Sequence, residues 1–183
     1  MTRLLNAGFV LRPFVSTDAP SFVTAVRESV ATVGRWLDWC HADFDEDDAL
    51  QWFAACESSR EAGDSYEFGI FRDDVLIGGA GLNHFNARHG FCNLGYWVRA
   101  SAQRQGAASA AVAALLPYAF DDLKQTRVEI VVAEGNTSSM VVARKAGAVH
   151  ECLARHRLRF HGEPVDAHVF SLVPADLRKG QLD

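Results

Sequence analysis

The segment AQRQGAASAAVAALL, residues 102–116, contains residue types that suit an anion-binding site. Alanine is the best helix former, so the run from Ala107 predicts a helix, and the first N–H groups of a helix have no acceptor within it. Gly106 lets a ligand approach the backbone closely, while Arg104 and Gln105 add a charge and further donors. The segment therefore predicts an anion site at the start of the helix, and a phosphate ester is the most suitable ligand.

The elements that must position this segment follow from hydrophobic periodicity and turn residues. Apolar runs predict strands over residues 8–15, 65–72, 74–85, 90–98, 127–133, 150–160 and 165–173. Amphipathic or capped segments predict helices over residues 16–39, 43–63, 106–123 and 136–147, and Pro117 predicts a kink or break in the third. This order predicts an α+β fold, with one domain over residues 1–183, a mixed, mostly antiparallel central sheet and helices on both faces.

Composition and charge exclude several classes of protein. The net charge is −5 and the isoelectric point is about 5.8, which argues against a nucleic-acid-binding protein and mildly favours a cationic partner. No apolar run approaches the ~18 residues of a membrane span. The N-terminal segment is a poor signal peptide, so we expect no membrane association and a cytoplasmic location.

The sequence contains few residue patterns that would indicate a metal site, a redox site or a nucleotide-binding site. The four cysteines are widely spaced and are expected to be free thiols, and the four C-terminal histidines have irregular spacing, so we expect no metal site. The sequence GGAGLNH, residues 78–84, lacks the last glycine of a dinucleotide-binding sequence, and no G-x-x-x-x-G-K-S/T segment is present. A nucleotide enzyme therefore stays a minor alternative.

Several segments, taken in order, resemble the GNAT superfamily of N-acetyltransferases and in particular its RimJ/RimL branch. The resemblance covers nearly the whole chain and rests on LRPFVSTDAPSF, VGRWLDW, IFRDDVLIGGAGL, LGYWV, QRQGAA, EGNTSSMVVARKAGAVHE and VDAHVFSLVPADL. QRQGAA, residues 103–108, is similar to the superfamily's (Gln/Arg)-x-x-Gly-x-(Gly/Ala) loop. The Asn-x-x-Ser sequence at Asn136 and Ser139 is similar to the start of a helix in this branch.

The resemblance implies acetyl-CoA as the cosubstrate and assigns residues to it. The glycine loop would wrap the pyrophosphate, and the strand before it would bind the pantetheine through backbone groups. Asn136 would bond the pantetheine, and Ser139 would lie near the thioester sulfur. The implied acetyl-CoA-binding residues are Tyr96, Trp97, Val98, Gln103, Arg104, Gln105, Gly106, Ala107, Ala108, Ser109, Asn136 and Ser139.

The resemblance also implies how protons move. Ser139 is the implied catalytic residue, because its hydroxyl can donate a proton to the departing thiolate. Other GNAT enzymes use a tyrosine downstream of this helix for that step, and this chain has no tyrosine after Tyr118. A role of Ser139 in capping and CoA contact alone is the alternative. Many members of the branch carry a glutamate as base where this chain has Asn93, and an amide cannot accept a proton at neutral pH. The remaining candidates for the base are Glu67, His84 and Glu151. Alternatively, water relays the proton, or the amine arrives already neutral and needs no base.

The function implied by the resemblance is acetyl transfer to a primary amine, such as the N-terminal α-amine of a ribosomal protein. A small amine such as an aminoglycoside or polyamine is the alternative acceptor, and a non-catalytic acyl-CoA-binding module is the alternative of another class. The acidic segment at residues 41–48 is either a solvated helix start or a rim that attracts a cation, and Trp36 and Trp39 either line the acceptor site or belong to the core. Exposed edges of the three-stranded meander at residues 65–98 would allow a homodimer.

Overall fold

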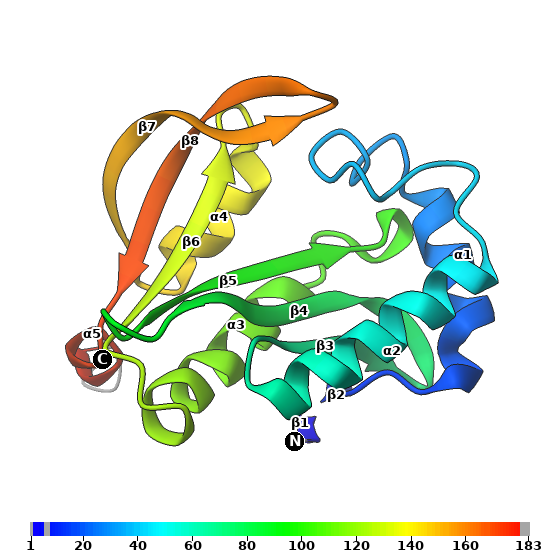
Figure 1. Cartoon of the computed structure of the whole chain (residues 1–183), viewed down its shortest axis with the longest axis horizontal. Helices are drawn as coiled ribbons and strands as arrows, with labels where there is room; N and C mark the ends of the chain where they lie inside the picture. Colours follow the sequence, from blue (N-terminus) through cyan, green and yellow to red (C-terminus); the bar gives the residue numbers. More distant parts are fainter. Residues whose placement is uncertain (1, 6–7, 180–183) are drawn as a thin grey trace.

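The computed structural model describes residues 2–5 and 8–179, which form an α+β fold built on an eight-stranded sheet in the order β1-β2-β3-β4-β5-β6-β8-β7 (Figure 1). Among the described residues, β5 and β6 are the parallel pair and all other neighbours are antiparallel. The strands are β1 (Arg3–Leu4), β2 (Val10–Arg12), β3 (Tyr66–Arg72), β4 (Val75–Asn86), β5 (Phe91–Val98), β6 (Arg127–Ala133), β7 (Val149–Phe160) and β8 (Glu163–Leu172).

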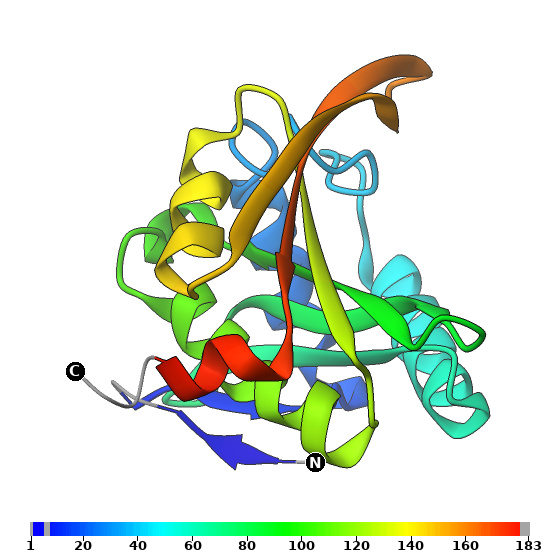
Figure 2. The ribbon, with the colours of Figure 1, turned by 90° about the vertical axis from the view of Figure 1, so that its left-hand side faces the viewer.

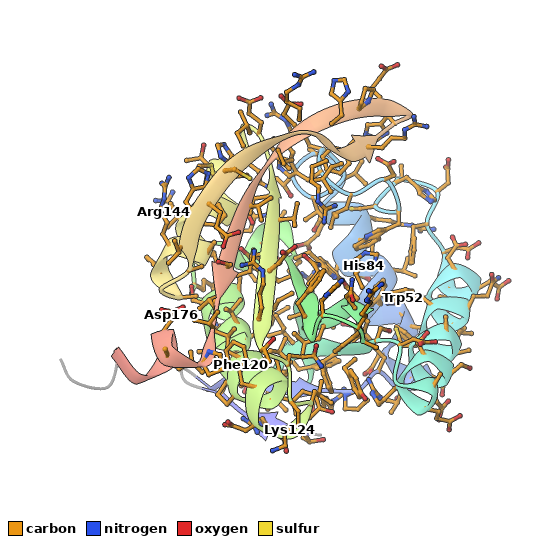
Figure 3. All side chains as sticks on the ribbon, turned by 60° about the vertical axis from the view of Figure 1, so that its left-hand side comes forward. Trp52, His84, Phe120, Lys124, Arg144 and Asp176 are labelled. Carbon is orange, nitrogen blue, oxygen red and sulfur yellow. The ribbon has the colours of Figure 1, made fainter. Side chains whose placement is uncertain are left out.

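Helices cover both faces of this sheet, as the sequence predicts. They are α1 (Ala19–Glu28), α2 (Glu46–Ala62), α3 (Ala107–Pro117), α4 (Thr137–Lys145) and α5 (Pro174–Lys179). Helices α1 and α2 lie on one face and α3 and α4 on the other (Figure 2). In Figure 3, Trp52 marks the α2 layer and Phe120 the end of the α3 layer, with the sheet between them. Each layer has its own buried cluster, centred on Phe22 and Phe71 in the first and on Leu115 and Ile130 in the second.

The predicted order of elements is confirmed, but the first helix and the first strand are shorter than predicted. Helix α1 ends at Glu28 and not at residue 39, because the chain folds back at Gly34, where a Cβ atom would overlap the carbonyl oxygens of Val30 and Cys40. The strand predicted over residues 8–15 is paired only from Val10 to Arg12, because Pro13 has no N–H group to continue the ladder. Strand β1 and helix α5 were not predicted.

The third helix breaks where Pro117 predicts it. Helix α3 ends at Pro117 and continues as a π-helical turn, η4 (Tyr118–Asp122), with Ala119 and Phe120 still buried. Because proline removes a backbone donor, the helix cannot keep its regular pattern there.

The edges of the meander β3–β4–β5 are covered only in part. Strand β3 pairs with β2, and β5 pairs with β6 at its first residues, so the meander lies inside the sheet. Where β2 and β6 pair with the meander, its backbone groups are in use, but residues 94–98 of β5 stay uncovered, so the homodimer stays a prediction.

Candidate active site

Strands β5 and β6 pair over a short stretch and then diverge. The register runs from Phe91 opposite Arg127 to Asn93 opposite Glu129, and beyond these residues β5 and β6 have no further register pair in the described structure. Figure 1 and Figure 2 show the two strands separating from this end of the sheet. Residues 94–98 of β5 therefore have backbone groups on one side that no strand covers, which is where the sequence analysis places Tyr96, Trp97 and Val98 as ligands of the cosubstrate.

The start of α3 lies directly after this open part of β5. The N-cap Gly106 has φ 88°, and Arg104 two residues earlier has φ 65°, so the loop turns twice through left-handed backbone. A Cβ atom at Gly106 would meet nothing within 4 Å. Among the described residues, the N–H groups of residues 105–109 have no hydrogen-bond acceptor, which gives a set of backbone donors at the positive end of a helix.

The polar side chains of the loop form hydrogen bonds within the chain. Gln103 donates from Nε2 to the carbonyl oxygen of Val98 at 3.2 Å, and Gln105 accepts from Arg72 at 2.7 Å. Both glutamines therefore hold the loop against the sheet. Ala107 and Ala108 are buried, and Arg104 is exposed. Whether any of these side chains contacts a ligand stays a prediction.

An ion pair that the sequence analysis missed fixes the loop to α1. Arg99 binds Glu28 in a bidentate pair, with Nη2 2.6 Å and Nε 2.9 Å from the carboxylate oxygens. The same carboxylate accepts hydrogen bonds from the N–H and hydroxyl groups of Ser101 at 3.0 and 2.7 Å. The hydrogen bond from Arg99, with those from Ser101, lowers the pKa of Glu28 to about 2. No local sequence pattern links residues 28 and 99, so only the fold reveals the pair.

Helix α4 brings Ser139 to Tyr96. Asn136 caps α4 by accepting from the Ser139 N–H group at 3.2 Å. The Tyr96 hydroxyl lies 2.9 Å from Ser139 Oγ and donates to the Ser139 carbonyl oxygen at 3.0 Å. Burial raises the pKa of Tyr96 to about 12, which keeps its hydroxyl protonated. Two hydroxyl groups therefore meet where β5 has left β6.

Trp97 is part of the α1–α2 layer. Its ring packs edge-on against Phe22 and Trp39, with centroids 5.5 and 5.3 Å apart, and it covers Gly79 of β4. The side chain is therefore structural, and only the Trp97 backbone is in position to serve a ligand. Val98 likewise packs against the buried cluster beneath α3.

The three candidate bases differ in their surroundings. Glu151 is held by both Nη atoms of Arg127 at 2.7 and 2.6 Å, and this pairing lowers the pKa of Glu151 to about 2. His84 is exposed at an irregularity in the β4–β5 register, with φ 50°. Glu67 is half-buried and accepts from Asn83, which in turn accepts from Asn93. Burial raises the pKa of Glu67.

The loop between α1 and α2 approaches the tip of the β7–β8 hairpin. The N–H group of His161 donates to both carboxylate oxygens of Asp38 at 3.1 Å. Trp36 reaches Gly135, the residue before Asn136, at 3.7 Å from where a Cβ atom would stand. Trp39 is 37% exposed while it packs against Trp97. These contacts place both tryptophans on the α1–α2 side of the diverging strands.

The acidic segment at residues 41–48 forms the start of α2. Asp45 caps the helix by accepting from the Asp48 N–H group at 3.0 Å, and Asp48 accepts from the Asp45 N–H group at 3.1 Å. This reciprocal capping accounts for two of the carboxylates through local structure.

Two histidines of β7 and β8 lie against each other. His150 and His168 share a hydrogen bond of 3.0 Å between ring nitrogens. Within residues 2–5 and 8–179, no group of three or more His, Cys, Asp and Glu side chains is arranged to hold a metal ion. In the same part of the chain, no helix is both long enough and apolar enough to cross a membrane.

Comparison with known proteins identifies the family. Residues 9–149 match the model of the acetyltransferase (GNAT) domain. The Bacillus subtilis (strain 168) protein YdaF, provisionally named a ribosomal N-acetyltransferase, is 26% identical over 171 residues, which is 92% of this chain and 93% of YdaF. The chain belongs to the GNAT acetyltransferase family, and it is an N-acetyltransferase.

Solved structures agree with the fold. A Vibrio cholerae protein with the provisional name of ribosomal-protein-serine acetyltransferase has a TM-score of 0.83 and 32% identity, with 95% of this chain and 98% of that chain covered. RimL, named a ribosomal L7/L12 α-N-protein acetyltransferase and solved with coenzyme A, has a TM-score of 0.86 at 19% identity, with 94% and 98% covered. The resemblance to the GNAT superfamily and its RimJ/RimL branch is thereby confirmed.

Proposed function

We propose that this enzyme moves the acetyl group of acetyl-CoA to the N-terminal α-amine of a protein, with a ribosomal protein as the acceptor. The observation that carries the proposal is the divergence of β5 and β6 beside the start of α3, with the Tyr96–Ser139 pair at the diverging strands. The names of YdaF, the Vibrio cholerae protein and RimL support a ribosomal acceptor. An acceptor on the ribosome would place the enzyme in the cytoplasm.

The cosubstrate would bind across three elements. Backbone N–H groups at the start of α3 would hold the pyrophosphate, with Arg104 as the nearby positive charge. The uncovered backbone of residues 94–98 would pair with the amides of the pantetheine arm. The thioester would then lie near Ser139, whose N–H group Asn136 already holds in place.

The chemistry requires two proton movements. A neutral amine attacks the thioester carbonyl carbon, the C–S bond breaks, the nitrogen loses one proton, and the departing thiolate takes a proton. Ser139 would donate that proton and would recover it from Tyr96, whose hydroxyl lies within hydrogen-bond distance. An α-amine has a pKa of about 8, so a useful fraction is already neutral at pH 7.

One experiment tests the proposal. Purified protein is titrated calorimetrically with acetyl-CoA, and thiol release is then followed with peptides carrying the N-termini of ribosomal proteins and with a panel of aminoglycosides and polyamines. Thiol release that depends on a peptide amine supports the proposal. Release with small amines alone would favour the alternative acceptor, and acetyl-CoA binding without release would favour a non-catalytic module. The homodimer stays a prediction that sedimentation analysis would test.

A further inference from the structure

We propose that Glu67 is a catalytic residue that removes the proton from the acceptor amine. The proposal rests on the proposed function, and it names a residue that neither the family match nor the relatives' names assign. It is carried by the position of the carboxylate on the sheet, by its hydrogen bonds and by the pairing of the other acidic side chains on nearby strands.

The position of the carboxylate depends on glycine. Glu67 of β3 is the register partner of Gly81 of β4, and Gly81 is the register partner of Gly95 of β5. A Cβ atom at Gly81 would overlap the Glu67 carboxylate, so this side chain lies across the glycine toward β5. Gly95 is the second residue after Asn93, where the pairing of β5 with β6 ends. The carboxylate is therefore directed along a row without side chains toward the diverging strands.

Two asparagines hold the carboxylate in this orientation. Asn93 Nδ2 donates to Asn83 Oδ1 at 2.9 Å, and Asn83 Nδ2 donates to Glu67 Oε1 at 2.9 Å. Both amide nitrogens lie 3.9 Å from the place of a Cβ atom at Gly95. Among the described residues, Glu67 Oε2 has no hydrogen-bond partner. One oxygen is thus fixed and the other is available to accept a proton.

Two glutamates on strands β6 and β7 are paired with one cation. Arg127 binds Glu129 at 3.0 Å and Glu151 at 2.6 Å. Glu67 forms no ion pair within the described part of the chain, although Arg60 of α2 donates to its backbone carbonyl oxygen. Of the groups on α2, Arg60 opposes protonation of Glu67, and the thiol of Cys56 has a pKa raised to about 12 by burial and by Glu67.

Burial raises the pKa of Glu67, while the hydrogen bond from Asn83 and the charge of Arg60 partly oppose this shift. A carboxylate with a raised pKa is a stronger base than an ordinary glutamate. In the reaction, Glu67 takes a proton from the ammonium form of the acceptor, and the neutral nitrogen forms the new N–C bond. The C–S bond breaks, the thiolate gains a proton, and the nitrogen loses its second proton. Overall, one proton is released for each amide formed.

The test compares Glu67→Gln with Glu151→Gln, which removes a carboxylate that Arg127 already neutralises. Each variant and the wild type are assayed for acetyl-CoA affinity by calorimetry and for kcat with a peptide acceptor across a pH series. We expect E67Q to lower kcat about tenfold at pH 7, with acetyl-CoA affinity unchanged and with recovery at high pH as the amine deprotonates in solution. E151Q should stay within about threefold of the wild type.

A second pair of variants keeps the proposal testable if E67Q fails to fold. Asn83→Ala removes the hydrogen bond that lowers the pKa of Glu67. In a plot of kcat/KM against pH, the fall in activity on the acidic side should therefore move to higher pH. His84→Ala, one residue away on the same strand, should leave this fall in place. Wild-type activity in E67Q, or an unmoved fall on the acidic side in N83A, would overturn the role of Glu67. If the wild type released no thiol with any amine, the proposed function would instead be overturned.

Discussion

The hydroxyl group of Tyr96 lies 2.9 Å from Oγ of Ser139, although the two residues are 43 positions apart in the sequence. The contact joins the open part of β5 to the first turn of α4. Because burial raises the pKa of Tyr96 to about 12, the hydroxyl stays protonated at neutral pH and can supply a proton to Ser139. Either oxygen of the pair can be the donor in this contact, and protonation of the departing thiolate by Ser139 stays a proposal.

Removing either hydroxyl should slow turnover more than it weakens acetyl-CoA binding. We expect Ser139→Ala to lower kcat about 100-fold and Tyr96→Phe to lower it less. Without the Tyr96 hydroxyl, Ser139 can still donate its proton to the thiolate and only its reprotonation is slowed. Steady-state kinetics and calorimetric titration with acetyl-CoA measure the two effects separately. If Ser139→Ala reduced affinity and kcat equally, Ser139 would be a binding residue only.

Substitutions at Gly106 should separate backbone strain from anion binding. Alanine at φ 88° costs about 1–2 kcal/mol of strain but meets no neighbouring atom, so Gly106→Ala should fold and bind CoA with modest loss. Gly106→Glu carries the same strain and adds a negative charge at the N-terminus of α3, so its CoA affinity should fall much further. Calorimetry with CoA measures the affinity of both variants, and thermal unfolding measures the backbone strain that they share. Equal affinities would contradict a pyrophosphate site here.

Glu28→Gln should destabilise the protein at neutral pH and much less in acid. The pKa of Glu28 is lowered in the folded state from 4.5 to about 2, so its carboxylate stabilises the fold above the unfolded value and loses this effect as the pH falls toward 2. Glu28 and Arg99 side chains are 28% and 11% exposed, and we expect a loss of about 1–3 kcal/mol at pH 7. Urea unfolding at about pH 7 and pH 2.5 should show the difference from wild type shrinking. A constant difference would argue against the ion pair.

Asp38→Ala should affect the acceptor and not the cosubstrate. Asp38 and His161 are both well exposed, so their contact should contribute less than about 1 kcal/mol to stability. It does, however, join the α1–α2 loop to the β7–β8 hairpin. We expect an unchanged melting temperature and acetyl-CoA affinity, with an increased KM for peptide acceptors. Asp43→Ala, on the same loop, is the matched control, and equal KM values for the two variants would contradict the role of the contact.

The local sequence predicted those parts of the site that depend on neighbours along the chain. Gly106 and the alanines after it define a helix start, and Asn136 and Ser139 define a capped turn, because spacing within one turn determines both. The same reasoning placed the break at Pro117. Whether these residues bind acetyl-CoA stays a prediction.

Contacts between distant strands could not be read in the same way. Val30 and Val33 continue the apolar stripe of α1, so periodicity gave no sign that the chain folds back at Gly34. The link from Asn93 through Asn83 to Glu67 needs the register of three strands, and the bond between Arg99 and Glu28 needs the docking of α1. The role of the β4 glycines also depends on distant residues and could not be predicted from the sequence. Gly79 leaves room for the Trp97 ring, and Gly81 leaves room for the Glu67 carboxylate.

The short pairing of β5 with β6 has a thermodynamic consequence. Past Asn93, the sheet lacks the backbone partners that its other neighbouring strands supply to one another. A bound pantetheine arm would act as a partial strand that joins the two halves of the sheet. Saturation with acetyl-CoA at about 100 times Kd should then raise the free energy of unfolding by about 2.7 kcal/mol. When the acetyl group has been transferred and CoA has left, β5 and β6 would again lack a partner between them. The protein should therefore be least resistant to unfolding between catalytic cycles.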